Sequence, residues 1–542
     1  MQIENLDHLG LIAGVIDELG LVELTNEELG THPLQQISPG QVVKAMILNA
    51  LGFLSAPLYL FGEFFSGKPV EHLLGEGVRA EQLNDDRLGR VLDELFDYGT
   101  TTFFLKAAMQ TVQRFKVERQ QFHLDSTSFA LDGEYAWEEA VGAPEGESKQ
   151  PQAIRICRGY SRDHRPELKQ FLVNLVCSKD GGIPLWLQVG SGNETDSRTF
   201  AHTAKSFAEQ WQVEGLMVMD AAFYSEPNLK QMGDLQWLTR VPQTLSAAQS
   251  LVETDEAAMT ECPCSLKGYR LWEKTESYGG VEQRWILVES QQRRQSDPRQ
   301  TSFLKQEKTL QRQLKELCSQ VFACKPDALE ALVRFEQTLQ WHTLRAVSVD
   351  SVFAKRTPGR PKRSTSCNEG TERVGYQIKA TLQRTAEFEQ KSSQRRSRFI
   401  LSTNHLDAEQ FPAERLLMEY KQQQAVERGF RFLKDPLFFT SSVFVKKPQR
   451  VEALALLMAL TLLVYNLAQR KLRQKLQQVN EAILDQKQKP TAIPTLRWVL
   501  QKFQAIHLVT LDALQQVSNL TDERRKIIHL LGFHCCRYYL LS

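Results

Sequence analysis

The sequence predicts an α/β protein in which a mixed β-sheet lies between helical regions of the chain. Three observations support this class. The chain of 542 residues is too long for one compact core, which indicates several structural units. Its 42% hydrophobic and 24% charged residues are typical of globular proteins and exclude a disordered or fibrous class. In the middle of the chain, short β-type runs alternate with helical stretches, as they do in α/β domains.

Residues 1–115 predict a helical N-terminal domain. Apolar residues recur at helical spacing from Leu9 to Leu21 and from Val42 to Phe53. Ser38 followed by Pro39 is a typical helix start, because serine caps free N–H groups and proline fits the first turn. Few strand signals occur in this part of the chain. We therefore expect helices before the sheet begins.

Residues 116–242 predict the first part of the core sheet. Runs of β-branched and aromatic residues favour strands, and the stretches between them have helical periodicity. This alternation indicates a mixed sheet with helices packed on it. The expected strands are Phe122 to Phe129, Phe171 to Cys177, Leu185 to Val189, Leu216 to Met219 and Trp237 to Val241, and the expected helices are Arg198 to Trp211 and Glu226 to Met232.

The pattern breaks after Val241, and residues 243–395 predict a large insertion domain. Its helical stretches are rich in charged residues, and its strands are separated from those of the core. The expected elements are a strand pair around Tyr269 to Lys274 and Arg284 to Val288, helices from Ser302 to Cys318 and from Pro326 to Trp341, and a strand from Val374 to Leu382.

Residues 396–450 predict the second part of the core, with a strand from Arg398 to Ser402 and a long helix from about Ala413 to Leu433. Residues 451–542 predict a helical C-terminal region. Its most apolar stretch, Ala453 to Ala468, is interrupted by polar residues and is shorter than the roughly 20 residues that cross a bilayer. We expect this stretch to be a buried core helix, and we expect no membrane association.

The charge distribution suits a polyanionic partner for the later part of the chain. The formal net charge is +1, but residues 1–100 carry 16 acidic and 5 basic side chains, which gives −11 there and +12 in the remainder. The nine cysteines are odd in number and lack the paired spacing of a zinc ribbon or a disulfide framework. A reducing cytoplasm is the compartment that this cysteine usage favours.

Two aspartates occur at strand-like runs. Asp125 lies within or at the end of the run from Phe122 to Phe129, and Asp220 directly follows the apolar run from Gly215 to Met219. A carboxylate at the end of a buried strand suits a site at the strand ends of an α/β sheet. Aspartate is also common in the turns that end strands, so a structural role is the alternative for each of them.

The long helix predicted in the second part of the core carries a mixed polar face. At about 100° per residue, with Tyr420 at zero, Gln423 falls at about 300°, Glu427 at about 340°, Arg431 at about 20° and Lys434 at about 320°. The face offers a carboxylate for a metal ion among donors that suit phosphate oxygens. The solvated face of an ordinary amphipathic helix is the alternative.

Asp125, Asp220 and Glu427, from two strands and one helix, form a ligand set for two hard divalent cations, which prefer oxygen donors. Two such ions about 3.5–4 Å apart activate a water or a 3′-hydroxyl and stabilise the leaving oxygen of an in-line phosphoryl displacement. This chemistry requires no covalent nucleophile from the protein. The candidate activity is therefore metal-dependent phosphoryl transfer.

Five segments of the chain resemble segments of bacterial insertion-sequence DDE transposases: HLDSTSF, GYSRDHRPELKQ, GNETD, VMDAAFYSEPNL and YKQQQAVERGFRFLKDP. The last is similar to the Tyr, Arg, Glu and Lys (YREK) signature of one branch of these enzymes. Tyr420, Glu427 and Lys434 fall in register with that signature, and Gln423 occupies its Arg position. A neutral amide cannot supply the charged bidentate fork of arginine, so one phosphate contact differs from the branch. The resemblance extends over nearly the whole chain.

The resemblance implies an RNase H-like catalytic core in which two Mg²⁺ ions are bound, with Mn²⁺ as a substitute. The candidate catalytic metal ligands are Asp125, Asp220 and Glu427, and the candidate contacts to DNA phosphates are Tyr420, Gln423, Lys434 and, from the polar face of the helix, Arg431. The implied activity is that of an endonuclease and strand-transfer enzyme for DNA transposition and recombination. Its partners would be the terminal inverted repeats of a mobile element, target DNA and a second copy in a homodimeric synaptic complex. A DNA hairpin intermediate and a location at the bacterial nucleoid follow from the same resemblance.

A basic segment, KRTPGRPKRS, covers Lys355 to Ser364. It is similar to an AT-hook core, in which arginine lies in a narrow A·T minor groove, so that Arg360, Lys362 and Arg363 are candidate minor-groove contacts. A flexible basic linker is an equally good interpretation.

Two other functions fit the same residues. A catalytically inactive DNA-binding protein of transposase ancestry would account for Gln423. A two-metal nuclease without strand transfer is the other, because RNase H-like cores serve several phosphoryl transfers.

Overall fold

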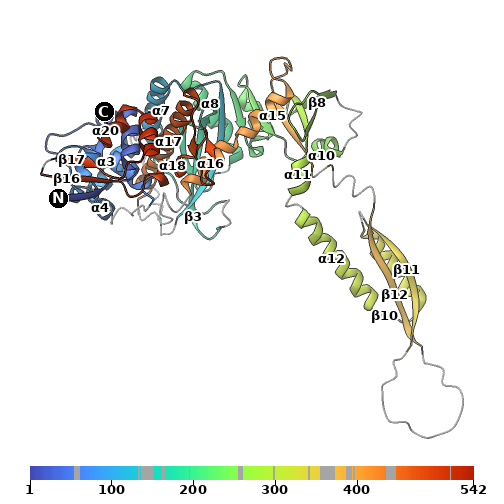
Figure 1. The fold of residues 1–542 in the computed structure, drawn as a ribbon. Helices are drawn as coiled ribbons and strands as arrows, with labels where there is room; N and C mark the ends of the chain where they lie inside the picture. Colours follow the sequence, from blue (N-terminus) through green and yellow to red (C-terminus); the bar gives the residue numbers. More distant parts are fainter. Residues whose placement is uncertain are drawn as a thin grey trace, which may run out of the picture.

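A computed structural model shows a body, which holds both chain termini, and an arm that projects from it (Figure 1). The structure describes residues 1–53, 61–131, 135, 152–160, 165–194, 196–253, 260–296, 300–339, 342–353, 373–385, 394, 397–434, 447–512 and 514–541. For residues 196–198, 294–296, 300–306, 373 and 424–428 only the path of the backbone is described.

A mixed sheet of nine strands lies at the centre of the body, as the alternation of strands and helices predicts. Its strand order is β4-β3-β2-β5-β6-β13-β9-β8-β7. β5 is parallel to β2 and to β6, and the other neighbours are antiparallel. The strands are β2 (Gln121–Leu131), β3 (Lys169–Ser178), β4 (Pro184–Ser191), β5 (Leu216–Met219), β6 (Trp237–Arg240), β7 (Thr260–Cys262), β8 (Tyr269–Tyr278), β9 (Val281–Ser290) and β13 (Arg398–Thr403).

The five strands expected in the first part of the core are therefore confirmed, with small shifts at their ends. All four residues of β5 are buried, because a central parallel strand is covered on both faces. The turn between β3 and β4 contains Gly181 and Gly182, which have φ angles of 80° and 68°. Glycine adopts this left-handed conformation without the steric cost that other residues have, so the pair permits a tight turn.

Opposite faces of β2 meet different helices. On one face, Phe122 packs edge to face against Phe207 of α8 (Asp196–Trp211), with ring centroids 4.8 Å apart. Side chains alternate along a strand, so Phe129 points to the other face. On that side α16 (Gln424–Leu433) packs against β2. Three shorter helices follow the strands of this region: η3 (Ala221–Phe223), α9 (Glu226–Met232) and α10 (Ser246–Glu253).

The long helix α17 (Pro448–Gln478) lies in the core of the body. Among the described residues, α17 is the one helix that is long and apolar enough to cross a membrane, with a window of mean hydropathy 2.0. That window is 89% buried inside the protein, and the core helix of a soluble protein meets the same criterion. The buried helix expected at Ala453 to Ala468 is therefore confirmed.

The N-terminal and C-terminal helices pack together, and both termini lie at the same end of the body (Figure 1). α1 (Leu9–Leu19) contacts α20 (Phe533–Tyr538). Buried Lys44 donates to Asp17 Oδ1 at 2.6 Å and to the Tyr538 hydroxyl at 2.7 Å, which connects helices from the two ends of the chain. The other helices of these regions are α2 (Leu21–Leu29), α3 (Pro39–Ala50), α4 (Phe61–Phe64), α5 (Val70–Leu74), η2 (Ala80–Gln82), α6 (Asp85–Tyr98), α7 (Thr100–Phe115), α18 (Leu496–Lys502) and α19 (Asp522–Leu531).

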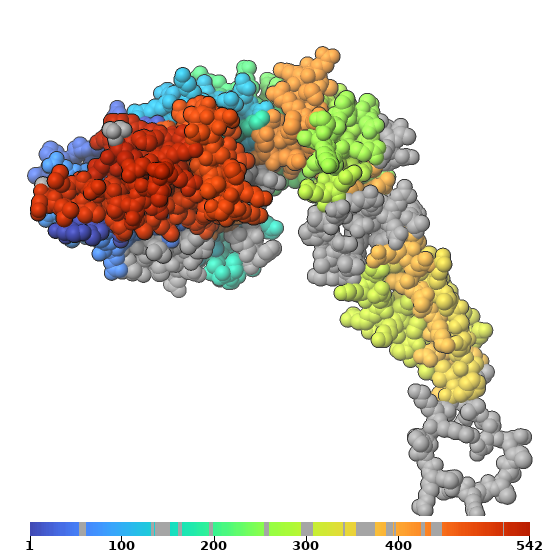
Figure 2. Space-filling model, in the orientation of Figure 1, coloured from blue at the N-terminus to red at the C-terminus, as the bar shows by residue number. Residues whose placement is uncertain are grey.

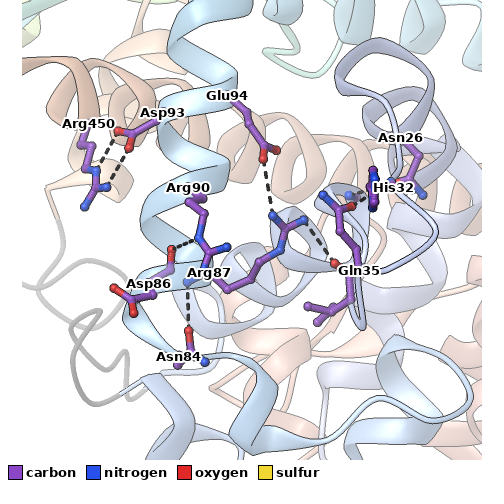
Figure 3. A network of polar contacts seen from close by, with 12 residues as sticks. Asn26, His32, Gln35, Asn84, Asp86, Arg87, Arg90, Asp93, Glu94 and Arg450 are labelled. Carbon is purple, nitrogen blue, oxygen red and sulfur yellow. Dashed lines mark hydrogen bonds and ion pairs between the residues drawn. The ribbon is translucent and has the colours of Figure 1, made fainter.

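Charged side chains hold α6 in this helical region (Figure 3). Arg450 of α17 donates from Nε and Nη2 to the two oxygens of Asp93, at 2.8 Å and 2.7 Å. Arg87 is buried and donates to the Ile37 carbonyl at 3.2 Å. The start of α3 is as predicted, because the Ser38 hydroxyl accepts a hydrogen bond from a backbone N–H of the first turn.

The expectation of purely helical terminal regions is wrong in part. β1 (Gln2–Asn5) pairs with β16 (His507–Leu511), which pairs with β17 (Leu514–Val517), and β14 (Ile483–Leu484) pairs with β15 (Pro490–Thr491). Residues 5 and 507 are partners although they lie 502 positions apart in sequence. The local periodicity of the sequence cannot indicate that two strands so far apart in the chain pair with each other.

The predicted insertion divides between the body and the arm. The expected strand pair β8 and β9 is confirmed, and with β7 it extends the main sheet. After α11 (Gln291–Ser296), the chain forms the arm, which stands apart from the body in Figures 1 and 2 and has its own sheet of order β10-β12-β11. The arm contains α12 (Gln300–Ser319), β10 (Val321–Phe322), α13 (Lys325–Gln337), β11 (His342–Phe353) and β12 (Arg373–Arg384). The residue limits of the predicted domains stay predictions.

Candidate active site

The parallel pairing of β2 with β5 brings Asp125 and Asp220 together. Leu124 of β2 pairs with Met219 of β5, and each aspartate is the next residue on its strand. Neighbouring strands lie about 4.8 Å apart, so the two main chains are roughly that close at the aspartates. Because side chains alternate along strands, both aspartates lie on the face of the sheet opposite to Leu124 and Met219. The structure thus joins two residues that are 95 positions apart in the sequence.

The amide that follows each aspartate orients its carboxylate. Asp125 is 9% exposed, and its Oδ1 accepts a hydrogen bond from Ser126 N at 2.8 Å. Asp220 is half-buried, and its Oδ1 accepts from Ala221 N at 2.6 Å, which caps η3. The Thr239 hydroxyl of β6 donates to the Asp220 carbonyl at 2.9 Å and fixes the end of β5. Asp220 therefore caps a turn, as expected if its role were structural, and it also lies beside Asp125.

The long helix expected from Ala413 to Leu433 is divided into α15 (Ala413–Gln422) and α16 at Gln423. The N–H of Gln423 bonds to the Tyr420 carbonyl at 3.2 Å, which is a tighter i to i−3 turn. Its φ of −52° and ψ of −26° remain helical, so the two helices continue in nearly one direction.

Lys434 directly follows α16 and shows where the end of this helix meets the sheet. Its Nζ lies 5.6 Å from the ring centroid of Phe129, which shares a face of β2 with Asp125. Glu427 lies on α16 seven residues before Lys434, which is close to two helical turns, so both residues occupy the same side of the helix. The side chain of Glu427 falls outside the described part of the structure.

The remaining predicted site residues have different environments. The Tyr420 ring packs near Phe399, with centroids 6.4 Å apart, beside the apolar cluster under α15. Gln423 is 6% exposed, whereas Arg431 is exposed. The polar face expected for this helix is thus partly buried. Arg360, Lys362 and Arg363 lie outside the described residues.

His123 and Cys177 form the buried surroundings of Asp125. His123 shares a face of β2 with Asp125 and is 1% exposed. Burial, and then the positive charge of Lys179, lower the pKa of His123 from 6.5 to about 4, so the ring is neutral at pH 7. Cys177 pairs with His123 on β3, and burial together with the negative charge of Asp125 raises the pKa of its thiol. His123 is thus a buried, neutral part of the sheet beside Asp125.

Sequence reasoning missed Glu419 and Lys179. Glu419 of α15 is 3% exposed, and its Oε1 accepts a hydrogen bond from Lys179 Nζ at 2.8 Å. Glu419, Gln423 and Glu427 follow one another at intervals of four residues, so they lie along one side of the helical path. That spacing was the available signal.

The two aspartates supply hard oxygen donors on one face of the sheet, which is the donor type that Mg²⁺ prefers. Among the described side chains, which do not include that of Glu427, no three His, Cys, Asp or Glu residues are grouped closely enough to hold a metal ion. Asp125 and Asp220 thus fit a divalent cation as a pair and require a further ligand.

Two family models match the chain. Residues 1–109 match a domain of unknown function (DUF4277), and residues 118–467 match the transposase DDE domain. No curated protein matches the sequence significantly. Among solved structures, a piggyBac transposase synaptic complex with hairpin DNA aligns with 93% of this chain and 82% of its own, at 10% identity and a TM-score of 0.37. The match to the transposase DDE domain covers more than half of the 542 residues of this chain, so the chain belongs to the DDE transposase family.

Proposed function

We propose that this transposase cuts DNA at the ends of a bacterial insertion sequence and joins those ends to target DNA by two-metal phosphoryl transfer. The observation that carries the proposal is the position of Asp125 beside Asp220, on one face of a sheet within the matched DDE domain. Metal-dependent phosphoryl transfer requires carboxylates that converge on one point. The main sheet begins with the order β4-β3-β2-β5-β6. If these five strands are renumbered 1 to 5 along the chain, the order is 3-2-1-4-5, which supports an RNase H-like core.

Glu427 is the proposed third metal ligand, and helix and strand dimensions support it. From Asp125 to Phe129 the strand advances about 13 Å, at about 3.3 Å per residue. From Glu427 to Lys434 the helix advances about 10.5 Å, at 1.5 Å per residue. Since the Lys434 ammonium lies by the Phe129 ring, a helix that runs in the direction of β2 brings position 427 near Asp125.

In the proposed reaction Asp125, Asp220 and Glu427 would hold two Mg²⁺ ions, which Mn²⁺ could replace, and the metal would supply activation of an oxygen nucleophile and charge neutralisation at the phosphate. Lys434 and Arg431 donate to phosphate oxygens of the DNA, and Tyr420 and Gln423 complete this contact surface. Neutral His123 keeps one side of Asp125 free of positive charge.

The proposed branch is the one with the Tyr, Arg, Glu and Lys signature, in which Gln423 replaces Arg. Gln423 is nearly buried on the helix side that carries Glu419. An amide there avoids the cost of burying a cation without full pairing. The hairpin intermediate, the homodimeric synaptic complex, the minor-groove contacts of Arg360, Lys362 and Arg363, and the place at the nucleoid are part of the same proposal.

The direct test incubates the protein with a DNA fragment that carries one element end, with Mg²⁺ or with EDTA, and separates the products on a denaturing gel. Mg²⁺-dependent cleavage at the repeat boundary is the expected result, and a covalently closed product identifies the branch. Joining of a pre-cut end to plasmid DNA separates a transposase from a nuclease.

Gln423 favours one alternative, a DNA-binding protein that has lost catalysis. Binding of the element end without cleavage in Mg²⁺ or Mn²⁺ would support that alternative and contradict the proposed enzyme.

A further inference from the structure

An ion pair next to the candidate site connects the β3–β4 turn to α15. Lys179, directly after β3, donates from Nζ to Glu419 Oε1 at 2.8 Å. The Glu419 side chain is 4% exposed and that of Lys179 is 34% exposed. Glu419 Oε2 is buried and has no hydrogen-bond partner among the described residues. A carboxylate in such a place depends strongly on the cation beside it.

The turn that carries Lys179 is itself held by α17. Arg470 of α17 donates to both oxygens of Asp180, at 2.8 Å and 2.5 Å. Asn466 of α17 donates to the Gly182 carbonyl at 2.7 Å. The N–H of Lys179 bonds to the Gln121 carbonyl of β2 at 3.1 Å. The backbone around Lys179 is therefore fixed both to the core helix α17 and to β2, the strand that bears Asp125.

Glu419 occupies the side of the helical path that leads to the proposed metal ligand. Glu419, Gln423 and Glu427 lie at successive steps of four residues, each of which advances about 6 Å and turns the helix by about 40°. Gln423, between them, is 6% exposed, so this side is turned toward the protein.

We propose that Lys179 and Glu419 are positioning residues of the transposase, which set the height of α15 and α16 above the sheet and so hold Glu427 opposite Asp125 and Asp220. This inference rests on the proposed function. The pair connects three parts of the site: the strand with Asp125, the core helix behind it and the helix with Glu427. Neither residue contacts metal or DNA; they act through the helix.

The test compares Lys179→Met and Glu419→Gln with Lys179→Arg, which keeps the charge. Asp93→Asn is the matched control, because Asp93 of α6 and Arg450 of α17 also form an ion pair between two helices, and neither helix carries a candidate metal ligand. The first readout is the affinity for Mn²⁺ without DNA, which is measured from the electron paramagnetic resonance signal of the free ion. The Mg²⁺ concentration for half-maximal cleavage and the urea midpoint are the second and third.

Lys179→Met and Glu419→Gln are expected to weaken Mn²⁺ binding and to raise the half-maximal Mg²⁺ concentration by about tenfold, as the loss of outer supports of metal sites does elsewhere. Lys179→Arg should retain wild-type values, and Asp93→Asn should change the urea midpoint alone. Wild-type Mn²⁺ affinity in both Lys179→Met and Glu419→Gln would overturn the inference, as would an equal loss in Asp93→Asn. If wild-type protein bound Mn²⁺ but failed to cleave DNA, the proposed function would fail while Mn²⁺ affinity still decided the role of the pair.

Discussion

Replacing His123 with leucine is expected to make the fold less sensitive to acid. The pKa of His123 falls from 6.5 to about 4 in the folded protein, mainly through burial. Because the folded pKa is the lower one, the unfolded chain binds the proton first as the pH decreases. The stability that depends on a neutral ring is therefore complete above pH 6.5 and is lost as the pH falls from 6.5 to 4.

The size of the effect follows from the shift. Each pKa unit corresponds to about 1.4 kcal/mol, so the complete loss is about 3 kcal/mol, of which about 2 kcal/mol has occurred at pH 5. His8 is fully buried too, and its pKa is lowered to about 4, so wild-type protein loses a similar amount there. The leucine variant should lose about half as much from these two groups.

Urea unfolding at pH 7.5 and at pH 5.0 measures this difference. The gap between the two midpoints should narrow in His123→Leu and, independently, in His8→Leu. If the gap in His123→Leu equals that of the wild type, the ring is protonated or hydrated in the folded protein and the reasoning from burial is wrong.

Three further predictions concern single side chains. Gln423→Arg should lower the urea midpoint of unfolding, because residue 423 is 6% exposed and a cation there would be buried without full pairing. Lys434→Met should reduce the salt dependence of DNA binding by about one phosphate contact, and titrations at several salt concentrations measure the slope. Gly181→Ala should destabilise the protein by about 1–2 kcal/mol in urea unfolding, because φ is +80° and a new Cβ would lie 2.9 Å from Arg470 Cβ. An unchanged slope or an unchanged urea midpoint would contradict these predictions.

The strands of the core could be predicted because their apolar runs are local signals. β5 reads as four consecutive apolar residues, and Asp220 directly follows it. That Asp125 lies beside Asp220 is a matter of strand order and register, which no local pattern contains. The pairing of β1 with β16 was missed for the same reason, since its partners lie at opposite ends of the chain.

The helix of the candidate site shows a second limit. The even angular spacing along residues 413–433 could not reveal the tighter turn at Gln423, which depends on one i to i−3 hydrogen bond. It also could not show which polar residues of the helix are buried. Glu419 reads as an ordinary surface carboxylate until its burial against Lys179 is known.

In the proposed reaction Asp125 and Asp220 together hold catalytic metal. The most direct measurement is cleavage of an element-end DNA by Asp220→Cys in Mg²⁺ and in Mn²⁺, with Asp220→Ala as the control. A thiolate is a poor ligand for Mg²⁺ and a better one for the softer Mn²⁺, so the cysteine variant should be inactive in Mg²⁺ and partly active in Mn²⁺, while the alanine variant stays inactive in both. Wild-type cleavage by the alanine variant, or by the cysteine variant in Mg²⁺, would contradict the claim.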